Sequence, residues 1–210
     1  MAAWTRETLL QAIQEGRSDF HNEDFSWADL SDLEFSGVDF SYATWLKVNF
    51  TGTTFRNCDM HEIYIVEPMG GGAVFEDCNL ERAFFQRAIM VGACFERVQA
   101  PGSKMLISRL NECQFIDADL RGISLIDSEM ERTQWRNVTM THAILRGADL
   151  SDSSFVVVTA ERADMRKARL TGSTFDRFRA DHCLIYGKRP WDGVRDGRDY
   201  ADLLPLFQED

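Results

Sequence analysis

The sequence CQFIDADLRG at residues 113–122 consists of two successive units of five residues. Each unit places a small residue, Cys113 or Ala118, two positions before a large apolar residue, Phe115 or Leu120. The spacing holds from Phe20 to Ile185, where most fifth positions hold Phe, Trp, Leu, Ile or Met, including twelve of the fifteen Phe residues. A period of five matches neither an α-helix nor a flat strand, so the pattern predicts a repeat architecture.

An aromatic residue also returns every twenty residues without a change of spacing. The series is Phe35, Phe55, Phe75, Phe95, Phe115, Trp135, Phe155 and Phe175. Twenty residues equal four units of five, so we expect a coil with four sides on which every ring returns to the same side. About eight coils should stack roughly 4.8 Å apart and bury a core that no single coil could bury alone. The eight aromatic residues should form a ladder along that core.

Three short stretches carry a family resemblance: ADLS at residues 28–31, ADLRG at 118–122 and ADLS at 148–151. They resemble the A(D/N)LxX units of pentapeptide-repeat proteins, and the shared register covers roughly residues 17–187. The resemblance implies an all-β fold, a right-handed quadrilateral parallel β-helix with four pentapeptides per coil.

The segments on either side of the repeat have a different character. Residues 1–16 form the N-terminal segment, in which we expect a short helix over 5–15 that is capped by Thr5 and ended by Gly16. This helix should cover the first coil of the β-helix, which spans residues 17–187. The tail at 188–210 carries apolar residues, among them Trp191 and Phe207. Three roles remain open for it: a cap on the last coil, a segment packed along the rod, or an arm that joins two protomers.

Two stretches depart from the repeat. Residues 63–72 place Pro68 at a small-residue position and Gly70 at a large one, and residues 98–104 place Ala100 at a large one. Proline and glycine within strands indicate bulges or loops that leave the coil. Because the aromatic series keeps its spacing across both stretches, we expect local distortions and no long insertions.

The composition limits the partners. The formal charge of −11 and the pI near 4.8 argue against direct nucleic-acid binding and permit a basic partner surface or mimicry of a polyanion. No stretch approaches the roughly eighteen apolar residues of a membrane span, and the first residues do not read as a secretion signal. We therefore expect a cytoplasmic protein that does not bind membranes.

The residues that usually carry chemistry do not assemble into a site. Cys58, Cys78, Cys113 and Cys183 fall on small-residue positions, which predicts burial and not a disulfide framework. All four histidines fall on one side, but they lack the spacing of metal ligands. Without a nucleophile elbow, a phosphate loop or an obvious cleft, we predict no enzyme, no catalytic residue, no cofactor and no metal.

Two outer surfaces are candidate interaction sites. The first is apolar and lies on the side centred on residues 25, 45, 65 and onward; with the tail it comprises Leu46, Tyr64, Phe84, Leu106, Ile126, Ile144, Trp191, Leu203, Leu204 and Phe207. A contiguous apolar stripe is usually covered, here by the tail itself or by a dimer or partner interface. The second is acidic and comprises Asp29, Asp32, Glu112, Asp119, Glu129, Glu131, Asp149 and Asp152. These carboxylates either imitate the phosphates of duplex DNA or form a solvated surface.

The family resemblance implies specific functions. The Qnr-type quinolone-resistance and mycobacterial fluoroquinolone-resistance members are acidic rods that dimerise and bind DNA gyrase, although this chain lacks the long inserted loops of the Qnr type. The likeness implies a non-catalytic DNA mimic that binds a type II topoisomerase and modulates or protects it, with a possible homodimer through the C-terminal region. The alternative is an interaction scaffold or secretion-system-associated protein that binds through its apolar face and tail.

Overall fold

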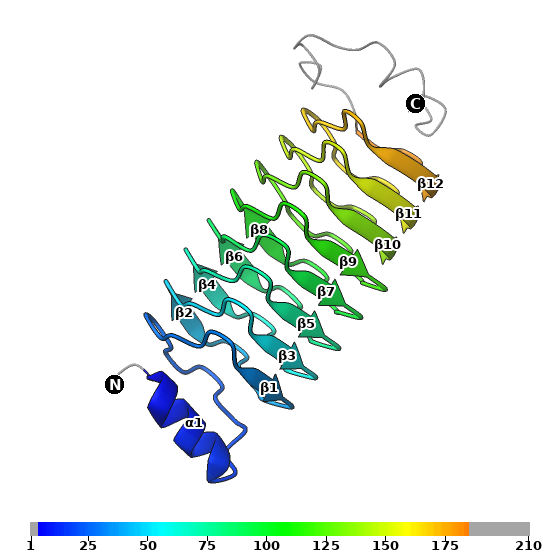
Figure 1. The fold of residues 1–210 in the computed structure, drawn as a ribbon. Helices are drawn as coiled ribbons and strands as arrows, with labels where there is room; N and C mark the ends of the chain where they lie inside the picture. The colour runs from blue at the N-terminus through cyan, green and yellow to red at the C-terminus, as the bar shows by residue number, and fades with distance from the viewer. Residues whose placement is uncertain (1–3, 185–210) are drawn as a thin grey trace.

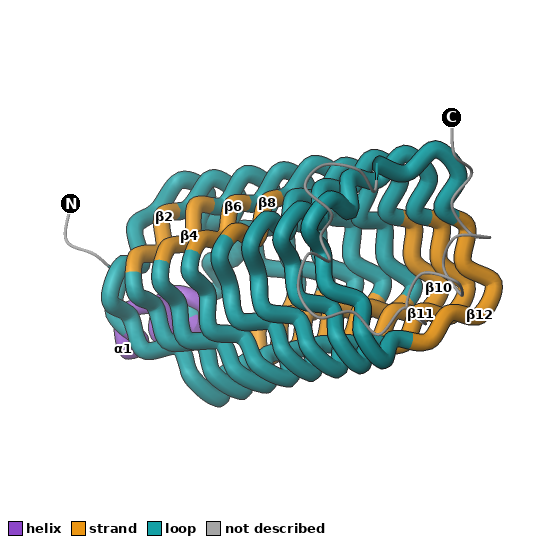
Figure 2. The backbone as a smooth tube through the Cα atoms, turned by 90° about the horizontal axis from the view of Figure 1, so that it is seen from above, coloured by secondary structure: helices purple, strands orange, loops and turns teal. Residues whose placement is uncertain are grey.

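The computed structural model describes residues 4–184, which form a straight rod of stacked coils with a helix at one end (Figure 1). Seen from above, the coils follow one another along the whole length without an extruded loop (Figure 2). The predicted fold class, an all-β parallel solenoid with a short N-terminal helix, is confirmed.

Short parallel strands make up two sheets. The larger sheet has the order β1-β3-β5-β7-β9-β10-β11-β12 and contains β1 (Glu34–Ser36), β3 (Thr54–Arg56), β5 (Val74–Glu76), β7 (Cys94–Glu96), β9 (Gln114–Ile116), β10 (Gln134–Thr139), β11 (Ser154–Thr159) and β12 (Thr174–Arg179). The smaller sheet has the order β2-β4-β6-β8 and contains β2 (Thr44–Leu46), β4 (Tyr64–Val66), β6 (Phe84–Gln86) and β8 (Lys104–Leu106). Single parallel bridges join successive coils on the remaining sides.

The aromatic series runs through the centre of the larger sheet. Every strand pair is offset by twenty residues, so that Phe95 lies beside Phe115 and Phe115 beside Trp135. The rings stack face to face, with centroids 5.0 Å apart for the first pair and 4.3 Å for the second. The first seven rings are buried, and Phe175 at the C-terminal end of the series is partly buried. The ladder therefore points into the rod along its full length.

Each side of a coil ends in a residue with left-handed backbone geometry. This residue stands two positions after the large apolar residue, and its φ lies near +55°, as at Asp32, Asn57 and Asp77. Asparagine, aspartate and glycine tolerate this region, whereas a β-branched residue there is strained. Ile107 and Val157 nevertheless adopt it, with φ of 53° and 57°. Stacking on the neighbouring coils holds these two corners in a geometry that they would not prefer alone.

The helix α1 (Arg6–Gln14) closes the N-terminal end of the rod. Thr5 and Thr8 form a reciprocal capping box at its start. Leu9 is fully buried, and Trp4 packs edge-on against Phe20 with ring centroids 5.2 Å apart. The helix thus covers the apolar end of the first coil, which is the capping role expected for it.

The expected distortion at residues 63–72 does not occur. β4 pairs in register with β2 and β6, and the carbonyl of Pro68 accepts a hydrogen bond from the Ile89 N–H at 3.0 Å. Gly70 stands at a fully regular large-residue position. Its Cβ, if present, would lie 2.0 Å from Cε2 of Phe50, because the Phe50 ring fills this space from the preceding coil. The prediction was wrong because the Phe50 ring fills the space that a large side chain at position 70 would otherwise occupy.

Residues 98–104 are equally regular. The N–H groups of Gln99, Ala100 and Gly102 donate to the adjacent coils at 3.0, 2.8 and 2.8 Å, respectively. Ala100 is fully buried and the two residues that follow it, Pro101 and Gly102, occupy the ordinary corner. This stretch is therefore neither a bulge nor a loop, in contrast to the sequence prediction.

A chain of hydroxyl groups supports the indole of Trp135. Its Nε1 donates to Oγ1 of Thr133 at 2.8 Å, and Thr133 Oγ1 lies 2.8 Å from Oγ of Ser153 on the next coil. All three side chains are buried. By contrast, Nε1 of the buried Trp45 has no hydrogen-bond partner within the described residues.

We expect Thr133→Val to lower the free energy of unfolding by about 2 kcal/mol, because it leaves the buried Trp135 N–H without an acceptor. Urea denaturation measures the change. Combining it with Trp135→Phe, which removes the donor, should cost less than the sum of the two single changes. Strict additivity would contradict the assigned hydrogen bond.

The cysteines behave as small core residues. Cys58, Cys78, Cys113 and Cys183 are buried, Cys94 is partly exposed, and all five are free thiols. Burial raises the pKa of Cys113 to about 12, so this thiol stays protonated and unreactive near neutral pH.

Candidate interaction surfaces

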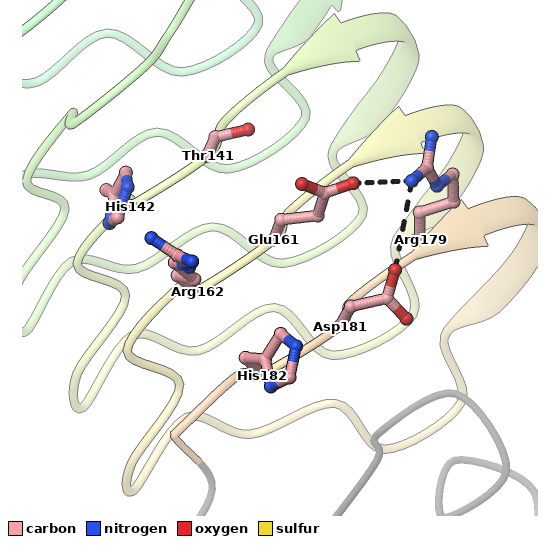
Figure 3. A pocket seen from close by; sticks show the side chains of 7 residues that line it. All are labelled: Thr141, His142, Glu161, Arg162, Arg179, Asp181 and His182. Atoms are coloured by element: carbon pink, nitrogen blue, oxygen red, sulfur yellow. Dashed lines mark ion pairs between the residues drawn. The ribbon is translucent and has the colours of Figure 1, made fainter.

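A shallow polar hollow lies on the histidine side near the C-terminal end of the described rod (Figure 3). It has a volume of about 450 Å³ and is lined by Thr141, His142, Glu161, Arg162, Arg179, Asp181 and His182. Six of them occupy corresponding positions in three consecutive coils, and the seventh, Arg179, is the last residue of β12. The sequence pattern indicated no obvious cleft, and the structure shows this shallow hollow. The sequence signal for the hollow was a series of three polar pairs spaced twenty residues apart: Thr141-His142, Glu161-Arg162 and Asp181-His182.

The charges in the hollow largely neutralise one another. The guanidinium of Arg179 lies 2.6 Å from a carboxylate oxygen of Glu161 and 3.8 Å from one of Asp181 (Figure 3). Within residues 4–184, no group of three His, Cys, Asp or Glu side chains is placed to hold a metal ion. The hollow therefore offers polar contacts to a ligand or a partner side chain.

The acidic residues singled out from the sequence do not form one continuous free surface. Several of them are paired with arginines from neighbouring coils or nearby positions. The pairs are Glu112 with Arg132 at 2.9 Å, Glu131 with Arg132 at 3.5 Å, Glu129 with Arg109 at 3.4 Å, Asp119 with Arg121 at 2.6 Å and Asp149 with Arg169 at 2.9 Å. These pairs reduce the negative potential of the C-terminal coils.

The two copies of the sequence ADLSD, at residues 28–32 and 148–152, make this difference clear. Asp29 and Asp149 each accept hydrogen bonds from the backbone and hydroxyl of the serine two residues later. On the next coil, however, Asp29 meets the neutral amide of Asn49 at 3.0 Å, whereas Asp149 meets Arg169. The serine hydroxyl and backbone N–H lower the pKa of Asp29, so it is ionised at neutral pH.

Excess negative charge is concentrated in the first half of the rod. Residues 17–90 contain thirteen acidic and five basic side chains, whereas residues 91–184 contain thirteen of each. The excess is therefore −8 in the N-terminal coils and zero in the C-terminal coils. Asp29 and Asp32 lie in the charged half, and the other six members of the candidate acidic face lie in the neutral half.

Four of the ten candidate apolar residues lie on the outer face of the sheet β2-β4-β6-β8, which we call the apolar sheet. Leu46 and Tyr64 are 37% and 45% exposed, and Phe84 is half-buried with its ring stacked on Tyr64 at 5.2 Å. Leu106 is half-buried on β8, and Ile126 and Ile144 are half-buried on the coils that follow. The four tail residues of this candidate interface, Trp191, Leu203, Leu204 and Phe207, lie outside the described residues.

A family model for pentapeptide repeats matches residues 34–64, 71–105, 118–156 and 136–177, with eight copies of the repeat. Together these matches cover more than half of the 210 residues. The chain belongs to the pentapeptide-repeat family. The matched segments of this pentapeptide-repeat protein leave out residues 65–70, where Pro68 and Gly70 depart from the consensus although the coil is continuous.

Solved pentapeptide-repeat structures have the same fold. HetL, a protein involved in the regulation of heterocyst differentiation in the cyanobacterium Nostoc sp. strain PCC 7120, is 15% identical; the match covers 91% of this chain and 100% of HetL, with a TM-score of 0.63. A trypsin-treated variant of QnrB1, a plasmid-mediated fluoroquinolone resistance protein, is 16% identical over 73% of this chain and 89% of that chain, with a TM-score of 0.53. No curated protein sequence matches the chain. At these identities the likeness concerns the fold alone.

Within the described part of this pentapeptide-repeat protein, no helix is long and apolar enough to cross a membrane.

Proposed function

We propose that this protein is a non-catalytic interaction module whose acidic N-terminal coils bind the DNA-binding surface of a type II topoisomerase, DNA gyrase, and modulate or protect the enzyme. The observation that carries the proposal is the uneven charge of the rod, with an excess of −8 over residues 17–90. Duplex DNA presents a negative charge about every 1.7 Å along its axis, and proteins that bind it offer a basic channel of matching shape. A straight acidic rod supports binding to such a channel.

The family context supports the same partner. QnrB1, a fluoroquinolone resistance protein, shares the fold of this chain. The proposal differs from the sequence analysis in the location of the binding surface, because Glu112, Glu129 and Asp149 are paired with arginines. The net excess of negative charge lies at the other end of the rod, in the half that contains Asp29 and Asp32.

The apolar sheet favours a second candidate, an interaction scaffold that binds a protein through this sheet and the tail. Tyr64 on this sheet and Ile107 directly after it are 45% and 52% exposed, and large exposed apolar side chains in one place favour a binding surface. In this case the acidic coils would contribute solubility only.

Purified protein should inhibit supercoiling by DNA gyrase, or protect the enzyme from a fluoroquinolone, and the effect should depend on the N-terminal carboxylates. We expect Asp29→Asn combined with Asp32→Asn to raise the concentration needed for half of the effect about fivefold, which corresponds to about 1 kcal/mol. Asparagine keeps the side-chain oxygen that accepts from Ser31, so the coil should stay intact.

The matched control is Asp149→Asn combined with Asp152→Asn, which changes the same positions of the same ADLSD sequence and removes the same charge. It should leave the half-effect concentration nearly unchanged. No effect of the unmodified protein on gyrase at tens of micromolar would favour the scaffold. Equal loss in both double variants would argue against binding through the N-terminal coils.

A further inference from the structure

The apolar sheet continues around a corner of the rod. Met69 and Ile89 stand on the adjoining side, directly after β4 and β6, and are 52% and 43% exposed. Ile107, which follows β8, is 52% exposed. With Leu46 and Tyr64 they form a patch of large apolar side chains that extends over four consecutive coils. A soluble protein seldom leaves such a patch in contact with water.

The border of this patch is basic. Lys47 and Arg87 share one acidic partner, Glu67, at 3.6 and 3.5 Å, and Lys104 stands exposed on β8. Two cations therefore flank the one carboxylate of Glu67, and Lys104 adds a third positive charge to the sheet, on a protein whose net charge is −11. An occupant that carries apolar and acidic side chains together would complement this surface.

The chain leaves the described rod on the same side. Parallel pairs connect Tyr64 with Phe84, Phe84 with Lys104, and then Lys104 through Ser124, Ile144 and Asp164 to Leu184. Leu184 is the last described residue, 49% exposed, and it lies in the outward row that begins on the apolar sheet. Twenty-six residues follow it.

Those twenty-six residues contain a segment with both apolar and acidic side chains, as the apolar sheet and its basic border require. Residues 199–207 read DYADLLPLF, with Leu203, Leu204, Leu206 and Phe207 beside Asp199 and Asp202. Six coils separate Leu184 from Tyr64, or about 29 Å at the spacing of neighbouring strands. The fourteen residues between Leu184 and Asp199 can span about 46 Å when extended, so the segment reaches every strand of the apolar sheet.

We propose that residues 199–207 of the same chain dock on the apolar sheet, with their leucines and Phe207 covering Tyr64, Phe84 and Ile107 and their aspartates facing Lys104 and Arg87. A second copy of the sheet is a poorer occupant, because a symmetric interface would bring two basic borders together. Tethering also gives the segment an effective concentration of about a millimolar, which favours it over a separate partner. A protein that binds through the sheet must displace the segment. This inference is independent of topoisomerase binding.

Two tyrosines allow a direct test in the full-length protein. Tyr64 on the apolar sheet and Tyr42 on the histidine side are 45% and 41% exposed in the described rod, so without a cover they should react similarly with hydroxyl radicals. If the docked segment covers about two thirds of the exposed surface of Tyr64, this tyrosine should be oxidised about threefold more slowly than Tyr42. Peptide mass spectrometry measures both rates in one sample, and light scattering gives the oligomeric state.

The variant Leu203→Asp with Leu204→Asp should remove the protection and bring the two tyrosine rates together. Val194→Asp, which adds an aspartate to the tail outside 199–207, is the control and should keep the protection. Equal rates in the unmodified protein would overturn the proposal, as would protection that survives Leu203→Asp with Leu204→Asp. Protection that appears only as a dimer forms would assign the sheet to a second copy instead.

Discussion

Replacing Phe115 by alanine is expected to lower the free energy of unfolding by about 3–5 kcal/mol. The Phe115 side chain is fully buried, and its ring is stacked between Phe95, with centroids 5.0 Å apart, and Trp135, at 4.3 Å. Alanine would leave a cavity in the middle of the ladder, and the neighbouring coils cannot close it without breaking their register. Stacked aromatic pairs add to the loss beyond the buried area.

Urea denaturation followed by circular dichroism measures this change. Tyr42→Ala is the control, because it removes a large aromatic ring that is 41% exposed, and it should cost under about 1 kcal/mol. If Phe115→Ala costs no more than the control, the inward ladder is not the core of the rod. Because stability in a solenoid is the sum of its repeats and their interfaces, the variant is also expected to broaden the transition.

Replacing Gly70 by alanine is expected to destabilise the protein by about 3 kcal/mol, at the upper end of what overpacking usually costs. The family consensus predicts the opposite, since most equivalent positions hold large apolar residues. The added Cβ would lie 2.0 Å from Cε2 of Phe50. That ring cannot move aside easily, because it is fully buried and packs against Trp45, Phe55 and Phe75 with centroids 5.9–6.1 Å away.

The adjacent glycine provides a matched control. A Cβ on Gly71 would meet only the Val91 carbonyl oxygen at 3.6 Å, so Gly71→Ala should be neutral or should stabilise by about 0.4–1 kcal/mol. Phe50→Leu, which shortens the obstructing side chain, should reduce the cost of Gly70→Ala in a double-mutant cycle. A stabilising Gly70→Ala would show that the Phe50 ring does not fill this position.

Much of the fold was predictable because the repeat is local in sequence and identical in each coil. The five-residue period and the twenty-residue aromatic series predicted the parallel solenoid, its register and the inward direction of residues such as Phe115. The capping helix was predictable from Thr5, Leu9 and Gly16. Departures such as Gly70 and Ala100 were misread, because the sequence pattern does not show which side chain from another coil fills the space.

The candidate surfaces were only partly predictable. The apolar stripe was visible as outward positions at Leu46, Tyr64 and Phe84, and the structure places them on one sheet. The acidic face was identified by residue type, yet Asp29 and Asp149 differ in what stands twenty residues later, Asn49 or Arg169. The hollow beside Arg179 arises from three coils and was missed for the same reason.

The sequence by itself therefore determined the period, the coil and the inward face, because each unit of five residues carries its own small and large positions. Only the tertiary structure decided which charges are neutralised, which glycine is filled by a neighbour and where apolar side chains remain exposed. Those properties depend largely on contacts between coils, and most such contacts join residues that lie about twenty positions apart in the chain.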